Sequence, residues 1–200
     1  MNWYTIGSLS FPASWVAVVA AFILTYAHIR WYFTKETAER YSNAFFIFIL
    51  IWKLSVILFQ WELVKRQPLS VVYFDGGLKG FVLGTAAALI YLLKTNKYRA
   101  FHAEGWIVLI TVYELVFYLF NQEHILLPGI QLIGNLLAIV WIRKKSGNVA
   151  ESYQILVLFT AFQAFMYSLK GDLLSVPVIT YTAVTLLLVV TAWKGRKKNQ

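Results

Sequence analysis

The chain is a succession of long apolar runs separated by short polar segments, and seven such runs are visible. Several are shorter than the ~20 residues that a perpendicular membrane-spanning helix needs, so their ends are defined only to about three residues. No Lys or Arg precedes Arg30, and the first run is longer than a signal-peptide core, so we expect a retained helix there. The predicted helices are residues 11–33, 43–61, 69–93, 105–120, 124–142, 153–169 and 173–193.

Composition assigns the chain to the integral membrane proteins. Of its 200 residues, 60% are hydrophobic and 14% are charged, whereas soluble domains are roughly 45–50% apolar. Cysteine is absent, which excludes disulfides, thiolate metal sites and thiol relays. With only three scattered histidines, we expect neither a metal nor a cofactor. The pattern therefore predicts an all-α, polytopic membrane protein.

The basic residues alternate between the two ends of the predicted helices. Thirteen of the 18 Lys and Arg residues lie on one side: Arg30, Lys35, Arg40, Lys94, Lys97, Arg99, Arg143, Lys144, Lys145, Lys194, Arg196, Lys197 and Lys198. The positive-inside rule makes that side cytoplasmic and places the N-terminus outside. Because the net charge of +9 sits in these short loops, it indicates topology and not nucleic-acid binding. No linker or repeat divides the chain, so we expect a single domain over residues 1–200.

Several polar residues fall within the outer halves of the predicted helices. Lys53 and Glu114 lie at matching depth, and we predict a buried ion pair because either charge alone would be costly in a membrane. Gln131 and Asn135 are four residues apart, so they share one helix face, and Gln163 lies in the outer half of the sixth helix. Two interpretations remain: a polar cavity open to the outside, or hydrogen bonds that join helices at about 1 kcal/mol or less each.

A glycine-rich segment containing Asp75, Gly76, Gly77, Lys79 and Gly80 opens the third predicted helix. Glycines allow close approach of backbone to backbone or to a ligand. The segment therefore has two interpretations. It is either a helix N-terminus with an acidic cap and tight packing, or an irregular entry into the membrane that borders a cavity.

The order of short motifs resembles the prolipoprotein diacylglyceryl transferases, which are seven-helix enzymes of the bacterial inner membrane. The residues 75–80, Asp-Gly-Gly-Leu-Lys-Gly, are similar to the family's His-Gly-Gly-Leu-x-Gly motif. Residues 119–123, Leu-Phe-Asn-Gln-Glu, are similar to the end of its signature near the fourth helix. Residues 128–134 and 171–177 are similar to its Pro-Thr-Gln-Leu-Tyr-Glu and Gly-Gln-x-Leu-Ser-x-Pro elements, and the motifs occur in the family's order.

The resemblance implies transfer of a diacylglyceryl group from phosphatidylglycerol to a cysteine thiol of a lipoprotein precursor. That reaction needs a base for the thiol and cations for the glycerol phosphate leaving group. The candidate bases are Asp75 and Glu123. The candidate substrate-binding residues are Gly76, Gly77, Lys79, Gly80, Asn121, Gln131, Asn135, Gln163 and Lys170. The resemblance also implies a multi-pass protein of the bacterial inner membrane that handles a phospholipid head group in an outward-facing cavity.

The sequence departs from the family at several functional positions. Asp75 replaces the family's histidine, and its signature arginine and asparagine fall on Leu115 and Tyr118. A later arginine and glutamate fall on Gln163 and Tyr167. One alternative is therefore a non-catalytic protein on the same scaffold that binds lipid or a partner membrane protein. A small transporter built around Lys53 and Glu114 is another, although no inverted repeat is visible.

Overall fold

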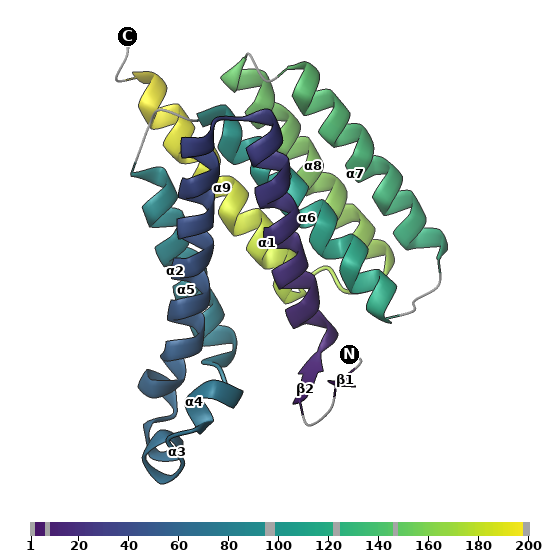
Figure 1. Cartoon of the computed structure of the whole chain (residues 1–200). Coiled ribbons are helices and arrows are strands. Elements are labelled where there is room, and N and C mark those ends of the chain that lie inside the picture. Colours follow the sequence, from purple (N-terminus) through teal and green to yellow (C-terminus); the bar gives the residue numbers. More distant parts are fainter. Residues whose placement is uncertain (1–2, 7–8, 95–98, 122–124, 146–147, 198–200) are drawn as a thin grey trace. The chain divides into compact units, whose positions relative to one another are not determined.

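The computed structural model describes residues 3–6, 9–94, 99–121, 125–145 and 148–197. This part of the chain is largely α-helical, as Figure 1 shows, which confirms the predicted fold class. The helices are α1 (Ala13–Tyr32), α2 (Lys35–Phe59), α3 (Trp61–Arg66), α4 (Ser70–Tyr73), α5 (Gly77–Leu93), α6 (Arg99–Asn121), α7 (Leu126–Lys144), α8 (Val149–Leu169) and α9 (Val176–Lys197).

Among the described residues, six helices are long and apolar enough to cross a membrane, namely α1, α2, α6, α7, α8 and α9. They follow the order of the predicted helices, so a multi-pass membrane protein is confirmed at this level. The remaining apolar helix, α5, has 17 residues, which is the lower limit of the ~17–25 residues that a spanning helix uses. It occupies the place of the third predicted helix, and the count of seven spans stays a prediction.

Several predicted boundaries are wrong by more than three residues, and the largest differences have local reasons. α2 begins at Lys35 and α6 begins at Arg99, both earlier than predicted. The first turns of these helices are polar, so a prediction made from apolar runs alone leaves them outside the helix. The third predicted helix is two helices, since the chain is extended at Phe74 and Gly77 has a φ of +58°. A left-handed residue of this kind interrupts a right-handed helix and favours glycine.

The sequence analysis also missed an N-terminal hairpin. Strands β1 (Trp3–Ile6) and β2 (Leu9–Pro12) pair antiparallel, with Tyr4 opposite Phe11. The helix predicted from residue 11 therefore begins at Ala13. The hydroxyl of Tyr4 donates to the backbone oxygen of Phe120, and the two rings meet edge to face at 5.1 Å. The hairpin is thereby attached to the end of α6.

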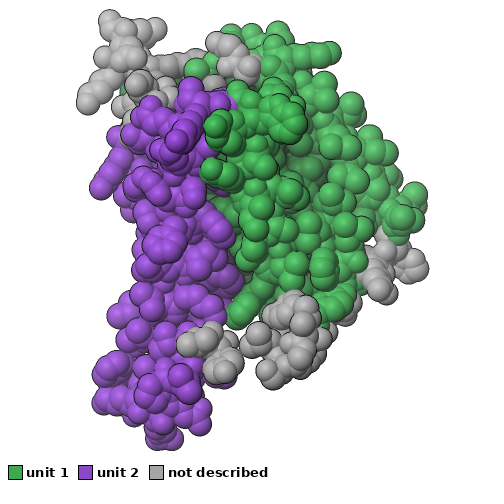
Figure 2. All heavy atoms as spheres, in the orientation of Figure 1, with its two compact units in different colours: residues 1–32, 97–200 green, residues 33–96 purple. Residues whose placement is uncertain are grey.

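The chain divides into two compact units, coloured separately in Figure 2. Unit 1 comprises residues 1–32 and 97–200, and unit 2 comprises residues 33–96. This division does not test the prediction of a single domain, and each unit is described by itself below.

In unit 1, α6 is the central helix, because α1, α7, α8 and α9 all contact it. The buried face of α1 consists of residues spaced by four, which begin with Ala13, Ala17 and Ala21. Such small residues let two helices approach closely in a membrane, where lipid is as apolar as the side chains. α8 also packs between α7 and α9. This arrangement allows side chains from four consecutive helices to meet.

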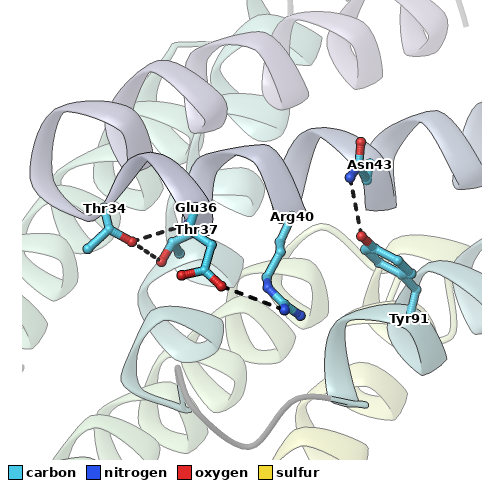
Figure 3. Close-up of polar contacts among 6 residues, drawn as sticks. All are labelled: Thr34, Glu36, Thr37, Arg40, Asn43 and Tyr91. Carbon is cyan, nitrogen blue, oxygen red and sulfur yellow. Dashed lines mark hydrogen bonds and ion pairs between the residues drawn. The ribbon is translucent and has the colours of Figure 1, made fainter.

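In unit 2, α2 packs along α5. Thr34 begins α2, and its hydroxyl accepts a hydrogen bond from the Thr37 backbone N–H at 3.3 Å. Figure 3 shows this N-terminal cap together with the Asn43 side-chain amide, which donates to the Tyr91 hydroxyl at 3.2 Å. The first bond satisfies a donor that the helix leaves unpaired, and the second joins α2 to α5.

Candidate functional site

A chain of buried amide side chains crosses from α7 to α8 and back within unit 1. Gln131 donates through Nε2 to Gln163 Oε1 at 2.6 Å, and Gln163 donates through Nε2 to Asn135 Oδ1 at 2.6 Å. All three side chains are at most 1% exposed. We call this chain the amide relay. The structure thus brings together three of the predicted substrate-binding residues, and the spacing of Gln131 and Asn135 places both on one face of α7.

Lys170, at the end of α8, fixes the direction of the amide relay. Its ammonium donates to Gln131 Oε1 at 3.0 Å, and the Tyr118 hydroxyl donates to the same oxygen at 3.0 Å. An ammonium can only donate, so Gln131 must turn its oxygen toward Lys170 and its NH₂ group toward Gln163. The same polarity then passes to Asn135. Among the described residues, Asn135 Nδ2 has no hydrogen-bond partner, so the relay ends on a buried donor.

The charge of Lys170 is poorly neutralised. Its ammonium lies 4.1 Å from the centre of the Tyr118 ring and 4.9 Å from that of Tyr167, which is within the range of cation–π attraction. Burial lowers the pKa of the Lys170 ammonium, and the negative charges of Glu114 and Asp172 offset part of this effect. Within the described part of the chain, no carboxylate lies within ion-pair distance of it. The group is therefore a half-buried cation that can accept an anionic partner.

Glu114 of α6 is a second buried centre in unit 1. It is 2% exposed, and its Oε1 accepts hydrogen bonds from Tyr167 of α8 at 2.9 Å and from Tyr181 of α9 at 2.5 Å. Because Tyr167 also faces Lys170, the two centres share a residue. Tyr181 was not singled out from the sequence, and Tyr167 was noted only as the position where a family glutamate falls.

The predicted pair of Lys53 with Glu114 links residues of different units, so it stays a prediction. Within unit 2, the Lys53 ammonium donates to the backbone oxygen of Phe74 at 3.4 Å, next to Asp75. Asp75 therefore has a nearby cation of its own. Asn121 donates through Nδ2 to the backbone oxygen of Phe117 at 2.8 Å, on its own helix. Glu123, a predicted base, lies outside the described residues.

The glycine-rich segment supports helix packing in unit 2. A Cβ atom at Gly76 or Gly80 would lie 1.8 or 2.0 Å from the Oγ of Ser55 on α2. The predicted acidic cap is not formed as such, because the N-cap of α5 is Gly76, which makes no side-chain cap bond; Asp75 lies one residue earlier, and its Oδ1 accepts from the Gly77 backbone N–H at 2.7 Å. The glycine contacts favour the tight packing of the first interpretation. Lys79 lies over the Phe59 ring at 5.5 Å, and a role of this segment in substrate binding stays a prediction.

A polar cluster at the opposite end of unit 1 was not found from the sequence. Glu104 of α6 is 2% exposed, and its Oε1 lies 2.8 Å from His28 Nε2 and 4.0 Å from Arg143 Nη1. The guanidinium also lies 3.2 Å from the centre of the Tyr32 ring. The cluster joins α1, α6 and α7. Its members stand at the edges of predicted helices, where charged residues are ordinarily solvated, so no pattern distinguished them.

Among the described residues, no group of three His, Asp or Glu side chains lies close enough to hold a metal ion. Comparison of the chain with family models, curated proteins and solved structures found no match. The motif resemblance therefore remains the basis for any family assignment.

Proposed function

We propose that this chain is a seven-span protein of the bacterial inner membrane, similar to the prolipoprotein diacylglyceryl transferases, that binds the phosphate of a phospholipid head group at Lys170. The observation that carries the proposal is the state of the Lys170 ammonium. It is half-buried, it is held by Gln131 and two aromatic rings, and it has no carboxylate within ion-pair distance among the described residues. A phosphate oxygen supplies the missing counter-charge.

The proposed topology would put this site on the outer face. Lys170 follows α8, while the basic segment at residues 143–145 precedes α8 and is cytoplasmic by the positive-inside rule. Lipid head groups of the outer leaflet would then reach Lys170. Lys79, another candidate substrate-binding lysine from the sequence, belongs to unit 2.

Reporter fusions test the sidedness. A periplasm-active reporter fused after Gln122 should be active and one fused after Lys145 inactive, with the reverse for a cytoplasm-active reporter. The expectation follows from the thirteen basic residues on one side against four on the other, with Lys53 inside a helix. If both positions reported the same side of the membrane, the proposed topology would be wrong. Lys170 could then no longer be assigned to the outer leaflet.

Lys170→Gln should weaken binding of short-chain phosphatidylglycerol by the purified protein about 10–100-fold. Hydrogen bonds to charged groups contribute about 1.5–3 kcal/mol, which corresponds to that range of affinity. Binding can be followed by the lipid-dependent rise in melting temperature in a mild detergent. Lys65→Gln is the matched control, because Lys65 is exposed and paired with Glu62 at 3.9 Å. Equal loss in both variants would refute the Lys170 site.

Catalytic transfer is a second candidate, favoured by the order of the motifs. A base would take the thiol proton, the thiolate would attack the glycerol carbon, and the C–O bond to glycerol phosphate would break. The test is complementation of a strain depleted of its own diacylglyceryl transferase, with lipoprotein modification detected by mass. Modification by the wild-type chain that is lost in Asp75→Asn or Glu123→Gln would support these bases. Absence of modification, with expression confirmed, would favour a non-catalytic binding protein.

A further inference from the structure

A groove lies beside the first half of α8, at the end of that helix opposite Lys170. It has a volume of about 740 Å³ and is bounded by α7 and α9. Val157 and Leu158 line its inner part, and both are about half exposed. Trp141 of α7 and Trp193 of α9 line its other end together with Lys145. The groove is thus apolar over most of its length and amphipathic at its mouth.

The dimensions of the groove match one leaflet of a bilayer. From Val149 to Leu158 the helix rises by roughly 14 Å, and half of a hydrocarbon core is about 15 Å. Tryptophan side chains favour the interface between head groups and acyl chains, which places Trp141 and Trp193 at that level. An acyl chain lying in the groove would therefore have its head group at the two tryptophans.

The positive charge at the mouth of the groove favours anionic lipids over neutral ones. The Lys145 ammonium forms an ion pair with the Glu151 carboxylate at 2.9 Å, so the net charge of these two side chains is close to zero. Lys144 and Lys194 are exposed and adjacent in the chain to lining residues. Basic clusters beside a membrane helix attract anionic head groups, at about 1 kcal/mol for each Lys or Arg. This excess of positive charge distinguishes the mouth from an ordinary lipid-facing surface.

We propose that this groove binds one anionic phospholipid, with an acyl chain along α8 and the phosphate between Lys144 and Lys194. The site is separate from the one at Lys170, since the groove is lined by the first half of α8, residues 149–158, whereas Lys170 follows the last residue of that helix. Assignment of the bound lipid to the cytoplasmic leaflet rests on the proposed topology, whereas binding itself does not. The protein would then hold a phospholipid at each end of α8.

Native mass spectrometry of the full chain tests the proposal, with phosphatidylglycerol and phosphatidylcholine of identical acyl chains added after delipidation. A Lys170→Gln background removes the other proposed site. One phosphatidylglycerol should bind with about 10–30-fold preference over phosphatidylcholine, from the two lysines. Leu158→Trp, which fills the groove, should abolish this adduct. Leu137→Trp on the exposed face of α7 is the control and should retain it.

Two double variants test whether the lysines at the mouth of the groove cause the preference for phosphatidylglycerol. Lys144→Gln with Lys194→Gln should remove the preference for phosphatidylglycerol, whereas Lys35→Gln with Lys94→Gln, which loses the same charge from unit 2, should retain it. Retention of the adduct in Leu158→Trp, or equal binding of the two lipids by the parent chain, would overturn the proposal. If Leu158→Trp does not fold by size exclusion, Val157→Trp fills the same groove. Because Lys170 is already replaced, failure here is distinct from failure of the outer site.

Discussion

Gly80→Ala is expected to lower the free energy of unfolding by about 1–3 kcal/mol, although it adds a single methyl group. A Cβ atom at residue 80 would lie 2.0 Å from Ser55 Oγ and 3.0 Å from the Trp52 backbone oxygen. The serine can rotate, but the carbonyl belongs to the backbone of α2, so α2 and α5 would have to separate. One turn later, a Cβ atom at Gly84 would lie 2.8 Å from the Phe48 backbone oxygen. Titration with a denaturing detergent measures the loss.

Two further variants show whether helix packing is the cause. Ser55→Gly combined with Gly80→Ala should recover part of the stability, because it removes the serine atoms and leaves the Trp52 carbonyl. Gly129→Ala on α7 is the matched control, since no atom would lie within 4 Å of its Cβ. Alanine is the better helix former by about 1 kcal/mol, so this variant should be neutral or slightly stabilising. Equal stability of Gly80→Ala and Gly129→Ala would show that the α2–α5 contact is not as described.

Gln163→Leu should destabilise unit 1 by about 2–6 kcal/mol, because it strands one donor and one acceptor in the core at about 1–3 kcal/mol each. The stranded groups are Gln131 Nε2 and Asn135 Oδ1, which now bond Gln163 at 2.6 Å each. Leucine has a similar volume, so loss of packing contributes little. The melting temperature of the purified protein and the detergent titration should change together.

The control for this substitution lies on the same helix. Gln154→Leu makes the same chemical change at an exposed position of α8, and we expect it to stay within about 0.5 kcal/mol of wild type. Gln163→Glu is a second comparison, because it keeps the acceptor for Gln131 and loses the donor to Asn135. A Gln163→Leu protein as stable as Gln154→Leu would mean that the amide relay is absent.

The features of this protein that could be predicted from its sequence are those set by the spacing of residues along a helix and by their depth in the membrane. The four-residue spacing of Gln131 and Asn135 and the depth of Gln163 were enough to place the three amides together. Lys170 was named as a candidate because it is one of few basic residues on the predicted outer side, and its role in binding stays a prediction. These signals survive because a membrane-spanning helix has a fixed rise and a polar group inside it must find a partner.

Other features left no such signal. Tyr167 and Tyr181 bond Glu114, yet a tyrosine in an apolar run equally suits an interface or a core, so its hydroxyl partner is set by packing alone. The Glu104 cluster depends on which helices are neighbours, and local patterns do not determine that. The hairpin before α1 was not predicted, and its last two residues, Phe11 and Pro12, were assigned to the first helix because they continue the apolar run.

In the amide relay both hydrogen bonds between amides are donated in the same direction, away from Lys170. The orientation of the buried amides therefore depends on the charge of the residue at position 170. Replacing Lys170 by an acceptor, as in Lys170→Glu, would favour Gln131 with its NH₂ group outward, and Tyr118 can follow because a hydroxyl both donates and accepts. Gln163 and Asn135 would then invert in turn, so that Asn135 presents its oxygen where Nδ2 now lies. The three amides thus form a two-state element, and side-chain ¹⁵N resonances of Asn135 would register an event at Lys170.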